Sequence, residues 1–316
     1  MRSAALCRCP VTAVADRQPT ETRSTATVLR AYLSLTKPRI VELLLVTTLP
    51  TMMLAAGRFP AGFLVPATLV GGALAAGAAN ALNCYCDRDI DGLMHRTEGR
   101  PLPSQVVTPR AALTFGLVLT VVSTALLLWA TTPLAAGLSL GAIGWYVFVY
   151  TLWLKRRTHH STVVGGVAGA APVLIGWAAV TGELSWAAAV LFAVVFFWQP
   201  PHFWALAMRF REDYARAEVP MLPVVAETVS VTRQIVTYAV VTVAVSMLLW
   251  PLGSGPIYPL LAGAAGAWFI WESVVLGRRA RAGESLNPMR LFHVSISYLT
   301  LVFLGVAGDV LLDLLG

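Results

Sequence analysis

Side chains that carry oxygen recur at a helical spacing near residue 85. Asn83, Asp87 and Asp91 follow one another at intervals of four residues, so on a helix they stay on one face with a drift of only ~40° per step. One amide and two carboxylates form a ligand set for a hard cation. Mg²⁺ suits it best, because this ion takes a few carboxylates together with substrate phosphates. Asp89 points off this face. The alternative is a solvated acidic helix end balanced by Arg88.

Basic and phenolic side chains are expected beside this cluster. Arg96 and Arg100 follow the acidic residues closely, and Tyr150 and Lys155 end a later apolar segment on the same side. Cations next to carboxylates and a metal suit a polyanion such as a diphosphate. The alternative is that these residues only anchor the loops at a membrane surface, which fully accounts for the two arginines after Lys155.

A second acidic segment contains Asp213, with Arg216 three residues later. It follows an apolar stretch in the same way as the first segment, and Glu212 or Glu218 could assist Asp213. Two facing acidic loops could hold two Mg²⁺ ions around one diphosphate, although this segment alone is weak support.

Aromatic residues and a histidine lie within a later apolar stretch. Pro200 and Pro201 remove backbone donors and predict a kink or break there. The kink would place His202 and Trp204 in the inner third of a bundle. An ionisable residue at that depth is a functional candidate, and the alternative is a histidine bonded to a carbonyl that the prolines set free.

The composition requires these residues to be positioned by membrane helices. Of the 316 residues, 57% are hydrophobic and 12% are charged, against about 45–50% and ~25% in soluble domains. A soluble globule could not bury so much apolar surface. The net charge of +7 does not indicate a nucleic-acid partner, because the basic residues lie in loops that flank the apolar segments.

The apolar segments predict an all-α polytopic membrane protein with nine transmembrane helices. Each segment has about the ~20 residues that a bilayer requires. The segments recur with a four-helix period, which indicates two parallel four-helix repeats plus a ninth helix. The expected spans are 40–56, 61–82, 111–130, 134–154, 162–180, 186–206, 235–252, 258–276 and 291–312.

The basic residues predict the orientation of the chain. Apart from Arg58, they all lie before the first span or in the loops after spans 2, 4, 6 and 8. The positive-inside rule therefore places the N-terminus and the loops with the candidate site residues in the cytoplasm, and the C-terminus outside. A bacterial plasma membrane is favoured over a mitochondrial inner membrane.

The N-terminal residues differ in composition from the rest. Residues 1–34 are predicted to be a disordered cytoplasmic tail or a targeting segment, and residues 35–316 form the membrane domain. Four cysteines form the pairs Cys7/Cys9 and Cys84/Cys86 on the reducing side, where disulfides are not expected.

The motifs above resemble those of a known family. The spacing of Asn83, Asp87 and Asp91 is similar to the first aspartate motif of the UbiA-type intramembrane prenyltransferases. Further segments resemble one branch of that family, the heme O synthases (protoheme IX farnesyltransferases). They are Leu35-Thr-Lys-Pro-Arg39, Arg96-Thr-x-x-Arg100-Pro-Leu-Pro, Tyr150-Thr-Leu-Trp-Leu-Lys-Arg-Arg-Thr158, Trp198-Gln-Pro-Pro-His-Phe-Trp-Ala-Leu206, Asp213-Tyr and Pro220-Met-Leu-Pro223.

The resemblance implies transfer of the farnesyl group of farnesyl diphosphate to a vinyl group of heme b, with water addition. The product would be heme O, a precursor of heme A for terminal oxidases. Mg²⁺ would be the cofactor, membrane lipid the surroundings, and a heme A synthase or an oxidase assembly protein a candidate partner. The implied catalytic and metal-binding residues are Asn83, Asp87, Asp91 and Asp213. The implied substrate-binding residues are Lys37, Arg96, Arg100, Tyr150, Lys155, His202, Trp204 and Arg216.

Two departures and two alternatives accompany this interpretation. Ala217 stands where the wider family has the second carboxylate of its second motif, and His159-His160 replace the usual residues after the basic run. A quinone- or chlorophyll-type prenyltransferase is the alternative within the class, but it leaves the Pro-Pro-His-Phe-Trp segment unexplained. A secondary transporter is the other alternative, and the position of the ionisable residues at helix ends rather than mid-membrane counts against it.

Overall fold

The computed structural model describes residues 24–60 and 62–315, except for the side chains of residues 39–45. Within that part of the chain the regular elements are all helical, as the composition predicts. They are α1 (Thr25–Thr36), α2 (Pro38–Ala56), α3 (Leu64–Cys86), α4 (Arg88–Asp91), α5 (Pro109–Ala130), α6 (Pro133–Gly144), the π-helix η1 (Trp145–Leu154), α7 (Ser161–Thr181), α8 (Trp186–Arg209), α9 (Arg211–Arg216), α10 (Leu222–Val225), α11 (Thr228–Met247), the short η2 (Trp250–Leu252), α12 (Ile257–Ala282) and α13 (Pro288–Asp313).

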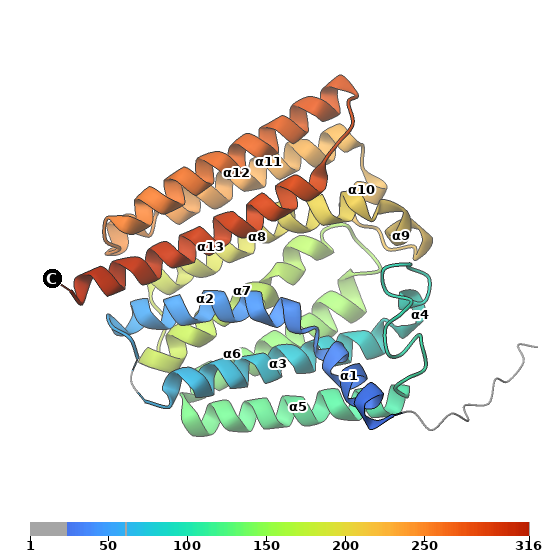
Figure 1. Ribbon diagram of the computed structural model, residues 1–316, viewed down its shortest axis with the longest axis horizontal. Coiled ribbons are helices and arrows are strands. Elements are labelled where there is room, and N and C mark those ends of the chain that lie inside the picture. Colours follow the sequence, from blue (N-terminus) through green and yellow to red (C-terminus); the bar gives the residue numbers. More distant parts are fainter. Residues whose placement is uncertain (1–23, 61, 316) are drawn as a thin grey trace, which may run out of the picture.

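The long helices have the length and composition of membrane spans. Among the described residues, eight segments of 21–26 residues are apolar enough to cross a bilayer, with α6 and η1 counted as one segment and α11 and η2 as another. The nineteen-residue α2 lies beside them as the expected first span, although its described apolar part covers only Val46–Ala56. The long helices run side by side along the bundle (Figure 1). The chain is therefore a multi-pass integral membrane protein.

The order of helices agrees with two four-helix units and a ninth helix. The first unit contains α2, α3, α5 and α6–η1, and the second contains α7, α8, α11 and α12. In both units a short helix follows the second long helix, α4 after α3 and α9 after α8. The units are joined where α2 packs on α7, and α13 packs on α2, α8 and α12.

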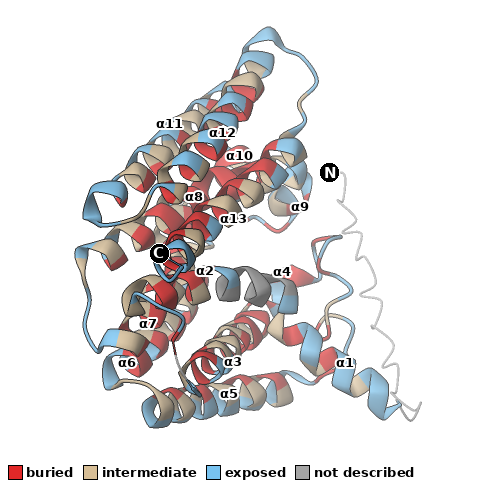
Figure 2. Ribbon diagram, turned by 60° about the vertical axis from the view of Figure 1, so that its left-hand side comes forward, coloured by how far each residue is buried: buried red, intermediate tan, exposed pale blue. Residues whose placement is uncertain are grey.

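The two units are packed differently. The second unit has a continuous core of large side chains, among them Tyr258 and Phe269, and Tyr298 of α13 belongs to the same core. In the first unit small residues bring helices together: a Cβ on Gly71 would lie 2.6 Å from Leu127, a close approach of α3 and α5 that is typical of membrane helices. Figure 2 shows α3 coloured almost entirely as buried or intermediate, with exposed residues on α5 beside it.

The N-terminal boundary differs from the expected one. Residues 25–34, predicted from composition to be part of a disordered tail or a targeting segment, belong to α1. This helix buries Ala31 and Leu35 against α3 and α5, and Tyr32 meets Phe115 with ring centroids 5.0 Å apart. The apolar contacts of these residues explain why they are helical. Residues 1–23, with Cys7 and Cys9, lie outside the described residues.

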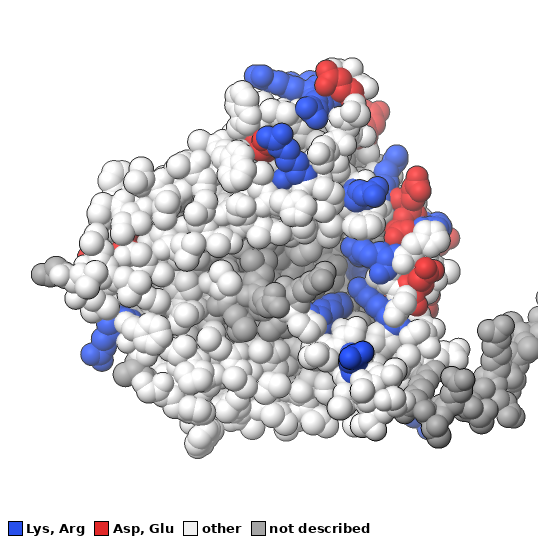
Figure 3. Space-filling model, in the orientation of Figure 1, with Lys and Arg blue, Asp and Glu red and all other residues white. Residues whose placement is uncertain are grey.

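Charged side chains gather at one end of the bundle. Figure 3 shows Lys, Arg, Asp and Glu concentrated at the end that carries α4 and α9, with long uncharged sides between the two ends. The loop after α2, which contains Arg58, lies at the opposite end together with the C-terminus. Both acidic segments therefore lie at the same end of the molecule, as the parallel arrangement of the two units predicts.

Candidate active site

The first acidic cluster lies where α3 gives way to α4. The helix does not continue through it: α3 ends at Cys86, and Asp87 (φ −92°, ψ 4°) links the two helices. Even so, the Asp87 amide donates to Asn83 O and the Asp91 amide donates to Asp87 O, each at 2.9 Å. These bonds keep the predicted four-residue register across the break. Asn83, Asp87 and Asp91 are 3%, 0% and 2% exposed, so they share the buried side.

Asp87 is the most deeply buried residue of the cluster. Its Oδ2 accepts hydrogen bonds from Lys155 Nζ at 2.5 Å and from Asn83 Nδ2 at 2.8 Å. Its Oδ1 is buried and has no hydrogen-bond partner among the described residues. Burial alone would lower the pKa of Lys155, but the charge of Asp87 outweighs burial and raises it. Lys155 is therefore a fixed cation.

Asp91 and Asp89 have different partners. Both oxygens of Asp91 accept from Arg100 Nη1, at 2.7 and 2.8 Å. Asp89 lies on the outside, with a side chain 58% exposed, and pairs with Arg156 at 2.6 and 2.7 Å. The hydrogen bonds from Arg156 lower the pKa of Asp89. The structure thus separates Asp89 from the buried face, as the spacing predicts.

Lys37 joins the cluster from the turn between α1 and α2. Its backbone has a positive φ of 52°, and its Nζ donates to Asn83 Oδ1 at 3.0 Å. Burial lowers its pKa to about 8, because a buried ammonium group has lost hydration. An anion bound nearby would relieve that cost, and Arg100 and Lys155 lie close enough to add their charges.

A π-helix positions the phenolic residues. At the end of η1 the Lys155 backbone amide donates to Tyr150 O, a bond that spans five residues, and the side-chain hydroxyl of Thr151 donates to Tyr146 O. Such i to i+5 turns are rare and occur often at functional sites. Tyr146 and Tyr150 stack with ring centroids 5.2 Å apart, and Thr151 Oγ1 accepts from Asn83 Nδ2 at 3.1 Å. Sequence reasoning missed Tyr146 and Thr151. The pattern that could have indicated them is the spacing of five and then four residues that leads from Tyr146 through Thr151 to Lys155.

The second acidic segment reaches the first through the loop after α4. Asp213 on α9 accepts from the Arg96 backbone amide at 3.2 Å and from the Arg216 guanidinium. Arg96 also donates to the hydroxyl of Tyr214 at 3.1 Å. Burial alone would raise the pKa of Asp213, but these bonds lower it. The structure therefore brings Arg96, Asp213 and Arg216 together, whereas Glu212 and Glu218 are exposed.

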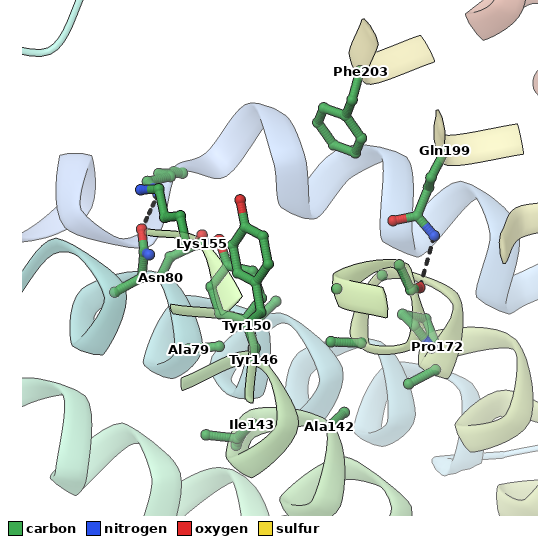
Figure 4. Close-up of a pocket in the computed structure, with 18 of the residues that line it drawn as sticks. Ala79, Asn80, Ala142, Ile143, Tyr146, Tyr150, Lys155, Pro172, Gln199 and Phe203 are labelled. Carbon is green, nitrogen blue, oxygen red and sulfur yellow. Dashed lines mark hydrogen bonds between the residues drawn. The ribbon is translucent and has the colours of Figure 1, made fainter. Parts of the chain in front are cut away.

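A cavity of about 650 Å³ opens between the helices above this cluster. The cavity has the size of small-molecule sites. One part is polar, and the other is bounded mainly by glycine, alanine and other small residues of α3, α6 and α7. Figure 4 shows Asn80, Tyr150 and Lys155 on one side of this space and Pro172 and Gln199 on the other. The charged and amide residues of the polar part are Lys37, Asn80, Asn83, Asp91, Arg96, Arg100 and Lys155.

Five predicted site residues, His202 among them, do not line the cavity. Asp87 and Asp213 lie behind it and hold Lys155 and Arg96, which do line it. Arg216 contacts Asp213 and His95 instead. Trp204 is fully buried in the core of the second unit.

His202 also lies outside the cavity lining. Its ring stacks between Trp198 and Phe292, at 4.3 Å from each centroid, and its Nδ1 lies 2.8 Å from Ser295 Oγ on α13. The rotation of α8 turns His202 toward α13 and away from the cavity. The partner is a hydroxyl group, not a carbonyl freed by the prolines, and the placement does not support contact with a substrate.

The oxygen donors fit a divalent cation that is shared with a substrate. The described residues contain no group of three or more His, Cys, Asp or Glu side chains arranged around a metal position. Mg²⁺ does not require one, since it binds through one or two carboxylates plus phosphates and water. Asp91 and the amide of Asn83 line the cavity, and Asp87 Oδ1 is a buried acceptor without a donor. This donor set is compatible with Mg²⁺.

The helical bundle defines an integral membrane protein with a cavity that gathers charged side chains in one part and small, mostly apolar residues in the other. The chain belongs to the UbiA prenyltransferase family, whose model matches residues 44–296.

Relatives and solved structures agree with this membership. A protoheme IX farnesyltransferase of Salinispora tropica is 58% identical over 304 residues, covering 96% of this chain and 95% of that protein. One of Frankia casuarinae is 58% identical over 279 residues, covering 88% and 96%. A UbiA homologue from Archaeoglobus fulgidus bound to DMAPP and Mg²⁺ has the same fold, with a TM-score of 0.65, 17% identity, and 87% and 99% of the two chains covered. A digeranylgeranylglyceryl phosphate synthase has a TM-score of 0.73 at 16% identity over 90% of this chain and 98% of that chain.

Proposed function

We propose that this protein transfers the farnesyl group of farnesyl diphosphate to a vinyl group of heme b, with addition of water, giving heme O and diphosphate. Such a product serves heme A formation for terminal oxidases. The supporting observation is a cavity whose one part gathers lysines, arginines and carboxylates while the rest is apolar. The identity of 58% to protoheme IX farnesyltransferases over nearly the whole chain supports the particular acceptor.

The polar part of the cavity is the site for the diphosphate. Lys37, Arg100 and Lys155 present three cationic side chains there, which would stabilise the negative charge that develops as the carbon–oxygen bond breaks. Asn83 and Asp91, with Asp87 behind them, would hold Mg²⁺. When bound, that ion supplies Lewis-acid stabilisation of the leaving diphosphate. Asp213 holds the backbone of Arg96 and so positions this residue at the cavity.

The apolar part of the cavity is the site for the farnesyl chain. Its residues are mostly small and leave room for a chain, and its polar groups are the hydroxyls of residues such as Thr68 and Ser139 and the amide of Gln199. Tyr146 and Tyr150 lie between the two parts, where the faces of their rings can stabilise a cation. Exclusion of bulk water protects the cation until the vinyl carbon attacks it.

Two other functions are less well supported. A quinone- or chlorophyll-type prenyltransferase would use the same diphosphate site, but the relatives cited above carry the heme-specific name. Transport is disfavoured because the charged residues gather at one end of the bundle. Association with a heme A synthase or an oxidase assembly protein stays a prediction.

The proposed orientation places α4, α9 and the diphosphate site on the cytoplasmic side of a bacterial plasma membrane. In a variant without native cysteines, a cysteine at Leu314 or Arg58 should react with an impermeant maleimide added to intact cells. A cysteine at Arg279 should react only after the cells are opened. All three positions are exposed. Equal labelling of Leu314 and Arg279 in intact cells would contradict the nine-span arrangement.

The function is tested with purified protein in lipid nanodiscs, supplied with heme b, farnesyl diphosphate and Mg²⁺. We expect the heme to gain a farnesyl group and one water, and we expect chelation of Mg²⁺ to stop the reaction. Unmodified heme from folded protein with both substrates would contradict the proposed function. Turnover that survives chelation would contradict only the metal assignment.

A further inference from the structure

Gln199 carries an amide in the wall of the mostly apolar part of the cavity, where the other polar side chains are hydroxyl groups such as those of Thr68 and Ser139. Gln199 is 6% exposed and lies on α8, where its side chain packs against Gly166 and Gly169 of α7. Its Nε2 donates to Gly166 O at 2.8 Å and to Val195 O at 3.3 Å. Because both partners are carbonyl oxygens, the side-chain nitrogen must face them. The orientation of the amide is therefore determined, and its oxygen must point the other way.

The oxygen of Gln199 has no hydrogen-bond donor among the described residues. A Cβ added to Gly169 would lie 2.3 Å from Oε1, so the glycine leaves this oxygen uncovered. Figure 4 shows the nitrogen bonded toward α7 and the oxygen on the side that faces Tyr150. A nearly buried acceptor in apolar surroundings is costly unless a donor reaches it. The site thus requires a ligand with a hydrogen to donate.

The reactants of the proposed function leave one candidate for that donor. The farnesyl chain has no polar hydrogen, and the ionised diphosphate only accepts. The pyrrole nitrogens of heme b bind iron and its ionised propionates only accept. Water is the remaining reactant, and it can donate to Oε1 while its own lone pair stays free to attack.

We propose that Gln199 holds the water molecule that adds to the heme vinyl group, an inference that rests on the proposed function. The carbon–oxygen bond of farnesyl diphosphate breaks and its electron pair leaves with the diphosphate. The vinyl π pair forms the new carbon–carbon bond, which leaves a cation on the carbon next to the porphyrin ring. The lone pair of the held water bonds to that carbon, and the released diphosphate takes the proton. Without this water, the cation loses a proton from the adjacent CH₂ and forms an alkene lighter by one water.

The test measures the ratio of hydroxylated to dehydrated farnesyl heme by mass spectrometry. Q199M removes both the donors and the acceptor, and we expect the dehydrated fraction to rise about 10-fold, the effect of losing one hydrogen bond of ~1.4 kcal/mol. Q199E keeps an oxygen acceptor but weakens the link to Gly166 O, so its product should remain hydroxylated. If Gln199 only joined α7 to α8, both variants would lose stability in a melting curve and neither would change the ratio.

A second variant covers the case in which Q199M does not fold. G169A places a methyl group 2.3 Å from Oε1 and 3.2 Å from Nε2, so the amide must shift and Oε1 is covered, and the variant should raise the dehydrated fraction as well. Hydroxylated product alone from Q199M and G169A would overturn the role of Gln199 and leave the farnesyl transfer intact. No farnesylated heme from the wild-type protein would overturn the proposed function and this inference together.

Discussion

Replacing Asp91 by asparagine is expected to lower farnesyl transfer at least ~100-fold, the scale of removing one electrostatic contact to the transition state. Asp91 lies in the polar part of the cavity beside Asn83, and its charge is the one that a cation there would meet. The amide keeps the shape of the side chain and can still accept from Arg100. Steady-state turnover with both substrates and a melting curve of the same preparation would measure the effect.

Asp89 provides the matched control, since it is two residues away on the exposed side. Its ion pair with Arg156 is largely solvated, and exposed pairs contribute only ~0–1 kcal/mol to stability. Asp89→Asn should therefore retain activity within about 2-fold. Equal losses in the two variants would show that the buried face has no special role.

Asp87 is expected to behave differently from Asp91. A carboxylate at the end of a helix is ordinarily solvated, but Asp87 is fully buried and paired with Lys155. Removing one partner of a buried pair costs ~3–5 kcal/mol, so Asp87→Ala should lose stability as well as activity. Asp91 is also buried and paired with Arg100, but asparagine can still accept from Arg100, so Asp91→Asn separates catalysis from folding better than Asp87→Ala does.

Filling the apolar part of the cavity should abolish use of the farnesyl chain while sparing the diphosphate site. Ala142 lines this part on α6, about three helical turns before Lys155. A phenyl ring there would displace several methylene groups of the chain. At ~0.8 kcal/mol each, the loss of four amounts to ~3 kcal/mol, or about 100-fold in affinity.

Ala142→Phe should accordingly bind farnesyl diphosphate weakly and inorganic diphosphate normally. Isothermal titration with each ligand would show the difference. Ala125→Phe is the control, because Ala125 lies on the exposed outer side of α5. Unchanged farnesyl diphosphate affinity in the Ala142 variant would place the chain elsewhere in the bundle.

The sequence best predicted those features of the site that depend only on the local geometry of a helix. The four-residue spacing of Asn83, Asp87 and Asp91 survives the break between α3 and α4, because the i to i+4 backbone bonds continue through Asp87. The off-face position of Asp89 was predictable for the same reason. The spans were predictable from the length of each apolar segment alone.

The partners of these residues were harder to predict. The burial of Asp87 depends on Lys155, which lies 68 residues away in sequence. Tyr146 and Thr151 were missed because a π-helix changes which residues share a face, and sequence periodicity assumes an α-helix. His202 was placed at a plausible depth, but the rotation of α8 about its axis decides that it faces α13.

The most direct test of the central claim is the mass of heme extracted from cells that make this protein and lack any other heme-farnesylating activity. The account predicts heme enlarged by one farnesyl group and one water in cells with the wild-type chain, and heme b alone in cells with the Asp91→Asn variant expressed at the same level. Heme b alone in both cell lines, with the wild-type protein folded in the membrane, would contradict it.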